Sequence, residues 1–193
     1  VIGKPYQYES SISHVDNDNF QAGKDVAKYL LDSGHRAIAF IGGNAELVVT
    51  IERMKGYEAA LMEAGIPVRK DYVIHEDFML EGGKEAVKRL MNLENSPTAL
   101  IVADDFMSLG VLNMLDELGI DVPGDISVFS FNNVLLAELS KPPLCSVDIN
   151  IESLGYQAVK LLLTRIKEPG SPAMRMIVPY ELIVRSSVAK IKN

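Results

Sequence analysis

The sequence predicts an α/β protein built on a parallel sheet that helices cover on both faces. Apolar runs of strand length alternate along the chain with segments of helical periodicity. The strand-like runs are continuously apolar, which is typical of strands buried on both faces. With 193 residues, 48% of them hydrophobic, the chain is long enough to bury such a sheet.

The first half of the chain gives two strand-helix alternations. The run "AIAFIGG" at 37–43 has the composition of a buried strand and ends at two glycines. Over 51–64 the apolar spacing becomes helical, and "YVIH" at 72–75 is again strand-like. The apolar spacing over 86–93 then predicts another helix.

The second half continues this alternation. Three further runs are strand-like: 98–103, 126–131 and 144–149. Residues 106–118 are expected to form a helix that ends at Gly119, because glycine commonly follows a helix in the left-handed conformation. A helical face over 151–161 follows, and "MIVPYELIV" at 176–184 is expected to be one last strand.

Polar or aromatic residues follow four of these strands at the point where each one ends. They are Gly42, Gly43 and Asn44; Glu76, Asp77 and Phe78; Asp104 and Asp105; and Asn132 and Asn133. Each could simply cap the next helix, as Asp and Asn commonly do. Ligands of open α/β sheets bind outside the carboxyl ends of the strands, so four such ends together favour a polar cleft. Its acids, amides and aromatic ring suit the hydroxyls and the apolar face of a sugar.

The adjacent acids Asp104 and Asp105 do not have the spacing of a catalytic pair. Neighbours on an extended chain point in opposite directions, so both carboxylates should not enter one site. We therefore expect one of them to face the cleft and the other to cap the 106–118 helix.

Motifs for metal or catalytic chemistry are missing. "DNDNF" at 16–20 is similar to the start of a calcium loop, but Gln21 stands where that loop needs Gly and Ala27 where it needs Glu. Asp18 or Asn19 as a helix cap explains the segment better. The three histidines lack metal-type spacing, and there is no phosphate loop or nucleophile elbow. We expect no enzyme, no metal and no cofactor.

The net charge and the cysteine content indicate which partners and which cellular compartment suit this protein. The net charge is −7 and no basic patch is visible, so this chain has no surface for duplex DNA. The single cysteine, Cys145, excludes an internal disulfide and suits a reducing compartment such as the cytoplasm. No apolar run is long enough to span a membrane. The start "VIGKPYQY" is not a signal peptide and is typical of the middle of a protein, so a fragment is expected.

Six stretches of the chain resemble the effector-binding domain of the LacI/GalR family of bacterial transcription regulators. They are "VDNDNFQAG", "LLDSGHRAIAFIGG", "RMKGYEAAL", "PTALIVADDFMSLGVL", "LGIDVPGDISVFSFNN" and "KPPLCSVDINIESLGYQAV". They occur in the family's order and span residues 15 to about 185. The stretch "SFNNVLLAELSKPPL" looks most like the maltose-operon repressors of that family.

The resemblance implies a periplasmic-binding-protein-like fold of two lobes that close over a small effector. Residues 1–15 would end the first lobe and cross over, and residues 16–147 would form the second lobe. Residues 148–175 would return to the first lobe, and 176–193 would supply the last strand of the second lobe and a tail. The family's helix-turn-helix head is absent from this chain. An isolated half would expose a large apolar surface, so the remainder of the first lobe is expected in the native protein.

The resemblance also implies roles for single residues. Arg53 stands where the family has its effector-binding arginine, and Phe78 where an aromatic residue walls the pocket. Asp104 replaces a usual Asn, and Asn132 and Asn133 replace a usual Asp pair. The expected effector-binding residues are Arg53, Phe78, Asp104 and Asn132.

The 106–118 helix is apolar on more than one side, although a helix on a sheet needs one apolar stripe. Packing within the chain could cover the second side. The resemblance implies instead that this helix and "LLAEL" at 135–139 line the interface of a homodimer. The expected contact residues are Val111, Met114, Leu136 and Leu139.

The leading interpretation is the effector-binding and dimerisation part of a sugar-responsive repressor, with a maltose-like disaccharide as a candidate effector. Operator DNA would be bound through the absent head. A solute-binding protein of a sugar transport system is the alternative, because it shares the fold. A sugar-modifying enzyme is disfavoured because no acid/base pair is in place.

Overall fold

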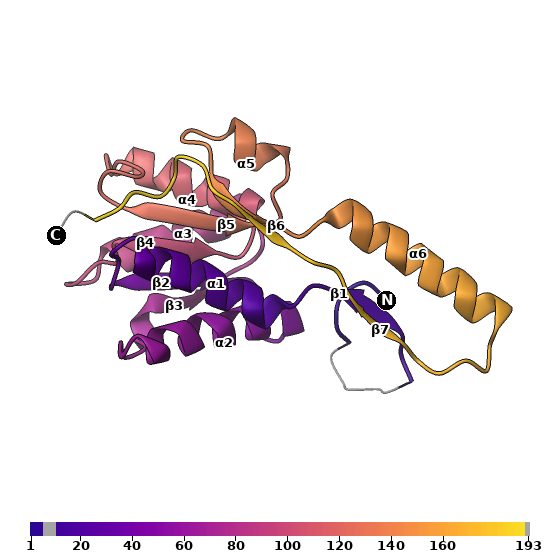
Figure 1. Ribbon diagram of the computed structural model, residues 1–193. Coiled ribbons are helices and arrows are strands. Elements are labelled where there is room, and N and C mark those ends of the chain that lie inside the picture. The colour runs from indigo at the N-terminus through magenta and orange to yellow at the C-terminus, as the bar shows by residue number, and fades with distance from the viewer. Residues whose placement is uncertain (6–10, 192–193) are drawn as a thin grey trace.

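The computed structural model describes residues 1–5 and 11–191 and contains a six-stranded sheet in the order β3-β2-β4-β5-β6-β8 (Figure 1). Its strands are β2 (Ile38–Gly42), β3 (Val73–His75), β4 (Ala99–Val102), β5 (Ser127–Phe131), β6 (Cys145–Asp148) and β8 (Glu181–Ile183). The first five are parallel, and β8 pairs antiparallel with β6. This confirms the predicted fold, with β8 as an antiparallel edge strand.

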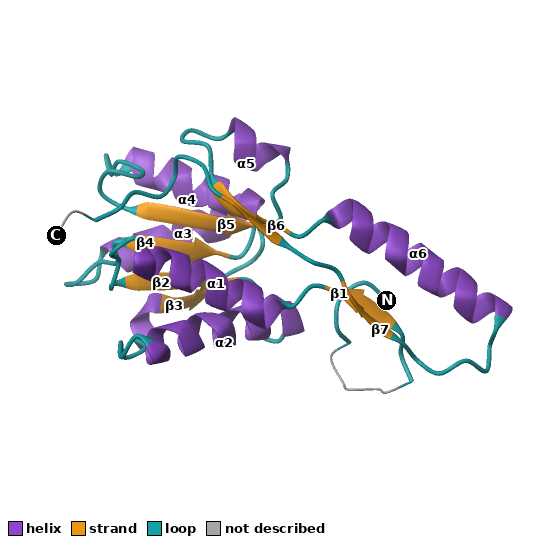
Figure 2. Cartoon of the chain, viewed as in Figure 1, coloured by secondary structure: helices purple, strands orange, loops and turns teal. Residues whose placement is uncertain are grey.

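Helices cover both faces of this sheet, as Figure 2 shows. Helices α1 (Asn19–Asp32) and α2 (Val48–Glu63) pack on one face, in a core that includes Leu30, Tyr57 and Phe129. Helices α3 (Leu80–Met91) and α4 (Asp105–Glu117) pack on the other, in a core that includes Leu90, Met107 and Val128. Both cores form because the strands between them are apolar on both faces.

Glycines let the helices of each pair approach closely. A Cβ on Gly23 of α1 would lie 2.2 Å from the carbonyl oxygen of Arg53 on α2. A Cβ on Gly110 of α4 would lie 1.9 Å from the carbonyl oxygen of Leu80 on α3. Side chains at either glycine would push the helices apart, so these contacts set the positions of α2 and α4.

The close packing of α3 on α4 corrects one expectation. Val111 is fully buried and Met114 is 6% exposed, both in the core shared with α3. The second apolar side of α4 is therefore covered from within the chain. Side chains with so little exposed surface do not reach a partner subunit, and the prediction that Val111 and Met114 are dimer contacts is incompatible with this packing.

A second, smaller unit lies beside the main sheet. Strand β1 (His14–Asp16) pairs parallel with β7 (Arg175–Ile177), and α6 (Ile151–Lys167) packs on them through Leu154 and Leu161. In Figure 1 this unit stands apart from the six-stranded sheet. Ala158 is partly buried against the same cluster. The large apolar side chains on the rest of α6 are exposed: Ile151, Tyr156, Val159, Leu162, Leu163 and Ile166.

The expected single strand at 176–184 is two strands in two different sheets, and that prediction was wrong. Strand β7 ends at Ile177 in the small sheet, and β8 begins at Glu181 in the large one. Pro179 lies between them. Proline has no N–H to donate to a strand ladder, which explains why one continuous strand does not form.

The chain passes between the two units three times, after β1, after β6 and after β7. The side-chain amide of Asn17, on the first crossing, donates to the carbonyl oxygens of Ile149 at 3.1 Å and Val178 at 2.8 Å, on the other two. Asn17 is buried and thus ties the three crossings together. This arrangement is typical of a hinge.

Two short helices complete the described chain, the 3₁₀ turn η1 (Lys70–Tyr72) and α5 (Leu135–Leu139). Helix α2 begins at Val48, before the predicted start of 51. No helix among the described residues is both long and apolar enough to cross a bilayer. Residues 6–10 of the expected 1–15 segment and residues 192–193 of the expected tail lie outside the described chain.

Candidate functional site

A cavity of about 250 Å³ lies between the small unit and the main sheet. All four residues expected to bind an effector line it: Arg53, Phe78, Asp104 and Asn132. The other lining residues are Ile2, Gly3, Asp16, Asn17, Asn19, Val49, Ala103, Ile149 and Leu154. Because Asp104 and Asn132 follow β4 and β5, the cavity sits at the carboxyl ends of the parallel strands, where such sheets bind ligands.

Arg53 projects from α2 into this cavity and is held by three neighbours. Its Nε donates to Oδ1 of Asn19 at 3.0 Å, and its Nη1 donates to the carbonyl oxygen of Ala103 at 2.9 Å. Its guanidinium also lies over the ring of Phe131. Nη2 makes no hydrogen bond to any described residue, so it remains a donor for a ligand.

Burial lowers the pKa of Arg53 to about 10, while the negative charges of Asp16, Asp104 and Asp105 act to raise it. The guanidinium is therefore still positively charged at neutral pH. A charged donor that is buried and already held in place binds with little loss of conformational entropy.

Asp104 and Asp105 do not share the two expected roles, in which one carboxylate faces the cavity and the other caps α4. Asp104 both lines the cavity and caps α4, because its Oδ1 accepts from the backbone N–H of Met107 at 2.7 Å. Asp105 does neither. It is 1% exposed and accepts from the N–H of Val134 and the hydroxyl of Ser146, both at 2.8 Å. Asp105 therefore fixes the segment that follows β5, which carries Asn132.

The same burial affects both carboxyl groups. Desolvation raises the pKa of Asp104, and the hydrogen bond from Met107 opposes this change. Desolvation also raises the pKa of Asp105, opposed by hydrogen bonds from nearby serines and Val134. With Oδ1 of Asp104 engaged in the cap, its second oxygen is the acceptor left for a ligand.

Asn132 and Phe78 are positioned by unusual backbone geometry and close packing. Asn132 has a positive φ of 97°, and its N–H donates to the carbonyl oxygen of Val147 at 2.9 Å. This bend of the backbone at the end of β5 places Asn132 at the cavity. The Phe78 ring packs directly on Gly43, where a Cβ would lie 2.0 Å from the ring. The glycine after β2 thus makes room for the aromatic wall.

Three polar residues of the cavity were not predicted from the sequence: Asp16, Asn17 and Asn19. Oδ1 of Asp16 accepts from the side-chain amide of Asn19 at 3.0 Å, and Asn19 in turn holds Arg53. Asp16 is the last residue of β1, a strand of three residues, and Asn17 and Asn19 come after it. The expectation that polar residues at strand ends line a cleft applies to them too, but "DNDNF" was interpreted only as a segment that caps a helix. The cap predicted for the next helix is Asp18, which accepts from the N–H of Gln21 at 3.0 Å.

The arrangement is suited to binding a small polar ligand. It offers one cation, two carboxylates and side-chain amides, which together supply donors and acceptors for several hydroxyl groups. The aromatic ring of Phe78 offers an apolar wall. In the part of the chain that the structure describes, no three His, Cys, Asp or Glu side chains gather as metal ligands would.

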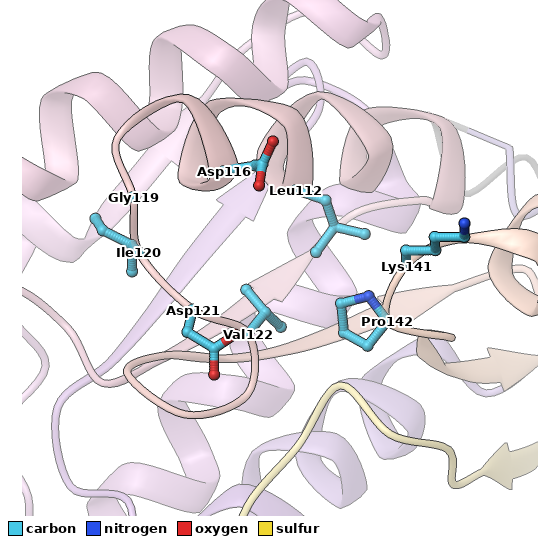
Figure 3. Close-up of a pocket in the computed structure, with 8 residues that line it drawn as sticks. All are labelled: Leu112, Asp116, Gly119, Ile120, Asp121, Val122, Lys141 and Pro142. Carbon is cyan, nitrogen blue, oxygen red and sulfur yellow. The ribbon is translucent and has the colours of Figure 1, made fainter.

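A second cavity, of about 260 Å³, lies at the C-terminal end of α4 (Figure 3). Asp116, Asp121 and Lys141 line it, together with Leu112, Gly119, Ile120, Val122 and Pro142. It contains none of the side chains expected to bind an effector.

Two of the four expected dimer contacts are exposed. Leu136 is 37% exposed and Leu139 is 66% exposed, both on α5. Val134 and Leu135, at the start of the same helix, are also exposed. We call Val134, Leu135, Leu136 and Leu139 the α5 patch.

The hinge-linked units and the polar cavity between them define a ligand-binding domain of the periplasmic-binding-protein type. Residues 27–188 match the family described as "Periplasmic binding protein-like domain". The chain belongs to this family, and its relatives place it with the LacI-family transcription regulators.

Solved structures support this assignment. A structure described as a LacI transcriptional regulator from Bacillus cereus subsp. cytotoxis is 45% identical, has a TM-score of 0.96, and matches 99% of this chain and 68% of its own. The complex of the regulator CelR with cellobiose is 33% identical at a TM-score of 0.92, covering 96% of this chain and 57% of that chain.

Curated relatives are also regulators. The HTH-type transcriptional repressor PurR of Histophilus somni is 33% identical over 90% of this chain and 52% of its own length. Catabolite control protein A of Priestia megaterium is 32% identical over 97% of this chain and 57% of its own length. The chain thus spans about half the length of the curated relatives it matches. They are transcription regulators rather than transport proteins or enzymes, which favours the regulator interpretation.

Proposed function

We propose that the chain is the effector-binding and dimerisation part of a sugar-responsive transcriptional repressor. The observation that carries the proposal is the meeting of Arg53, Phe78, Asp104 and Asn132 in one cavity at the strand ends. The likeness to regulators of known structure supports it, among them one solved with cellobiose. A regulator from Enterococcus faecium, 28% identical with a TM-score of 0.87, was solved with ribose.

The effector proposed is an uncharged sugar, with a maltose-like disaccharide as the first candidate. Nη2 of Arg53 would donate to a hydroxyl or ring oxygen, and the free oxygen of Asp104 would accept from a hydroxyl. The side-chain amide of Asn132 can do both, and Phe78 would pack on the apolar face of the ring. Two carboxylates beside one guanidinium disfavour an anionic ligand such as a sugar phosphate.

The division of the chain is proposed on the same basis. Residues 1–15 and 148–175 are assigned to the first lobe and residues 16–147 to the second. The boundary expected at 175 moves to about 178, because β7 ends at Ile177 in the small sheet and Val178 packs in its core. The segment from β8 onward is the last strand and tail of the second lobe. The exposed apolar side chains of α6 would then be covered by the remainder of the first lobe. A DNA-binding head outside this chain would contact the operator, and the protein would work in the cytoplasm without catalysing a reaction.

Dimerisation is proposed through the α5 patch, with Leu136 and Leu139 kept from the original prediction. Exposed leucines gathered on one short helix suit a contact between copies. A helix-turn-helix regulator usually reads two half-sites, so two heads must be held at fixed spacing.

The test uses the full-length protein and the DNA upstream of its own gene. DNA affinity is measured by fluorescence anisotropy with and without maltose, cellobiose or ribose. We expect specific DNA binding that one of these sugars changes. Sugar binding without any specific DNA binding would contradict the repressor and favour the alternative, a solute-binding protein of a transport system.

A further inference from the structure

A salt bridge spans the two sides of the effector cavity. Nζ of Lys4 donates to Oε1 of Glu52, and the two side chains are 14% and 20% exposed. Gly3, next to Lys4, lines the cavity on one side, and Arg53, next to Glu52, lines it on the other. The pair is therefore adjacent to the site without being part of its lining.

The two residues of this pair belong to different units. The segment that carries Lys4 is bound to β1: Gly3 N–H donates to the carbonyl oxygen of Val15 at 2.8 Å, and Lys4 N–H donates to Oδ2 of Asp16 at 3.0 Å. Glu52 lies on α2, which packs on the main sheet. Any rotation of the units at the crossings near Asn17 that opened the cavity here would have to separate Lys4 from Glu52.

The other ion pairs of the described residues do not have this property. Lys24–Glu63 joins α1 to α2, and Lys84–Glu117 joins α3 to α4, each pair within one helical layer of the main sheet. The remaining three also lie within the unit of the main sheet: Arg69–Asp71, Lys88–Glu85 and Arg89–Glu76. The attraction between Lys4 and Glu52 therefore favours the arrangement in which the two units are close together and the cavity is closed. The other five pairs do not act between the units.

We propose that Lys4 and Glu52 form a latch that holds the effector cavity closed and so sets the effector affinity without contacting the effector. The latch rests on the proposed function, because the cavity must be the effector site. Its physical basis is a population shift. If only the closed arrangement binds tightly, the apparent affinity scales with the fraction of protein that is closed. The attraction of the pair favours that fraction, and salt screens it.

The test is a double-mutant cycle in the full-length protein with Lys4→Met, Glu52→Gln and the two combined. Affinities for maltose, cellobiose and ribose are measured by titration calorimetry at low and high ionic strength. Each single change should weaken binding by about two- to fivefold, the range for an ion pair near the surface. The double change should be no worse than either single change. Lys84→Met with Glu117→Gln is the matched control, which should leave affinity unchanged.

A second measurement does not depend on the ligand. Spin labels at Met62→Cys and Glu168→Cys, both exposed, report the distance between α2 and the end of α6, while the native Cys145 is buried and stays unlabelled. In the sugar-free protein, Glu52→Gln should broaden this distance distribution toward longer values, and the Lys84/Glu117 control should not.

The outcomes separate the two proposals. If none of the three sugars binds the wild type, the sugar-binding function fails, and the spin-label distances alone decide the latch. If the distance distribution of Glu52→Gln equals that of the wild type, the latch is wrong, whichever sugar binds. Single changes whose effects on affinity add fully in the double variant would also overturn it, because the residues would then act independently.

Discussion

The guanidinium carbon of Arg53 lies 4.0 Å from the centroid of the Phe131 ring. Phe131 ends β5, and the other bonds of Arg53 reach Asn19 at the start of α1 and Ala103 just after β4. Three elements therefore set the direction of one side chain. This explains how a long, flexible arginine can be kept ready for a ligand with one donor nitrogen free.

Gly43→Ala should weaken effector binding by ~1–3 kcal/mol, the range for overpacking, because the new Cβ would overlap the Phe78 ring. Titration calorimetry with a sugar that binds the wild type measures the loss. Gly170→Ala, in the exposed turn after α6, is the control, since nothing lies within 4 Å of a Cβ there. If folded Gly43→Ala protein binds the sugar as tightly as the wild type, the Phe78 ring does not form a wall of the effector site.

Leu136→Asp combined with Leu139→Asp should turn the proposed dimer into a folded monomer, because two charges would replace apolar contacts of the α5 patch. Analytical ultracentrifugation of the full-length protein gives the mass, and circular dichroism checks the fold. Met62→Asp, at an apolar residue 73% exposed on α2, is the control and should stay dimeric. A dimer of wild-type affinity in the double variant would remove α5 from the interface.

Val111→Asp should behave differently from the α5 changes. Val111 on α4 is fully buried in the core that α4 shares with α3. An aspartate there would be a buried, unpaired charge. We expect a loss of ~4 kcal/mol or more in the free energy of unfolding, measured by urea titration. A Val111→Asp protein that is stable but monomeric would restore this residue as a dimer contact.

Asp105→Asn should lower the free energy of unfolding by ~1–3 kcal/mol, because one amide oxygen cannot replace the two carboxylate oxygens that accept from Val134 and Ser146. Burial raises the pKa of Asp105 in the folded state above its ordinary value of 3.8. The stability linked to this proton is thus fully present below pH 3.8 and is lost as pH rises through the raised pKa. Urea titrations from acid to neutral pH should show the deficit of the variant shrinking as pH rises. A deficit that grows with pH would contradict this sign.

The position of the site was largely readable from the sequence. Phe78, Asp104 and Asn132 follow buried strands, and the carboxyl ends of parallel strands share one edge. Arg53 came only from the family resemblance, because nothing in its helical spacing marks it. Asp16 and Asn19 were missed because β1 has three residues and gives almost no strand signal.

Other errors arose from contacts between distant parts of the chain. The burial of Val111 depends on α3, and no local pattern states which helix covers its side of α4. The role of Asp105 depends on Ser146 and Val134, which lie 41 and 29 residues away. The apolar run 176–184 has the composition of one strand. Its two halves pair with different sheets, and composition alone does not indicate the pairing partners of a strand.

The most direct test of the account is titration calorimetry of maltose, cellobiose and ribose against the wild-type protein, Arg53→Ala and Arg69→Ala. Arg69 also lies 4.0 Å from a ring centroid, that of Tyr72, but it is outside the cavity. For a sugar that binds the wild type, Arg53→Ala should lose ~1–3 kcal/mol of binding free energy, the range for a hydrogen bond that involves a charged group. Arg69→Ala should lose none. Unchanged affinity in a folded Arg53→Ala protein would remove the cavity at the strand ends as the effector site.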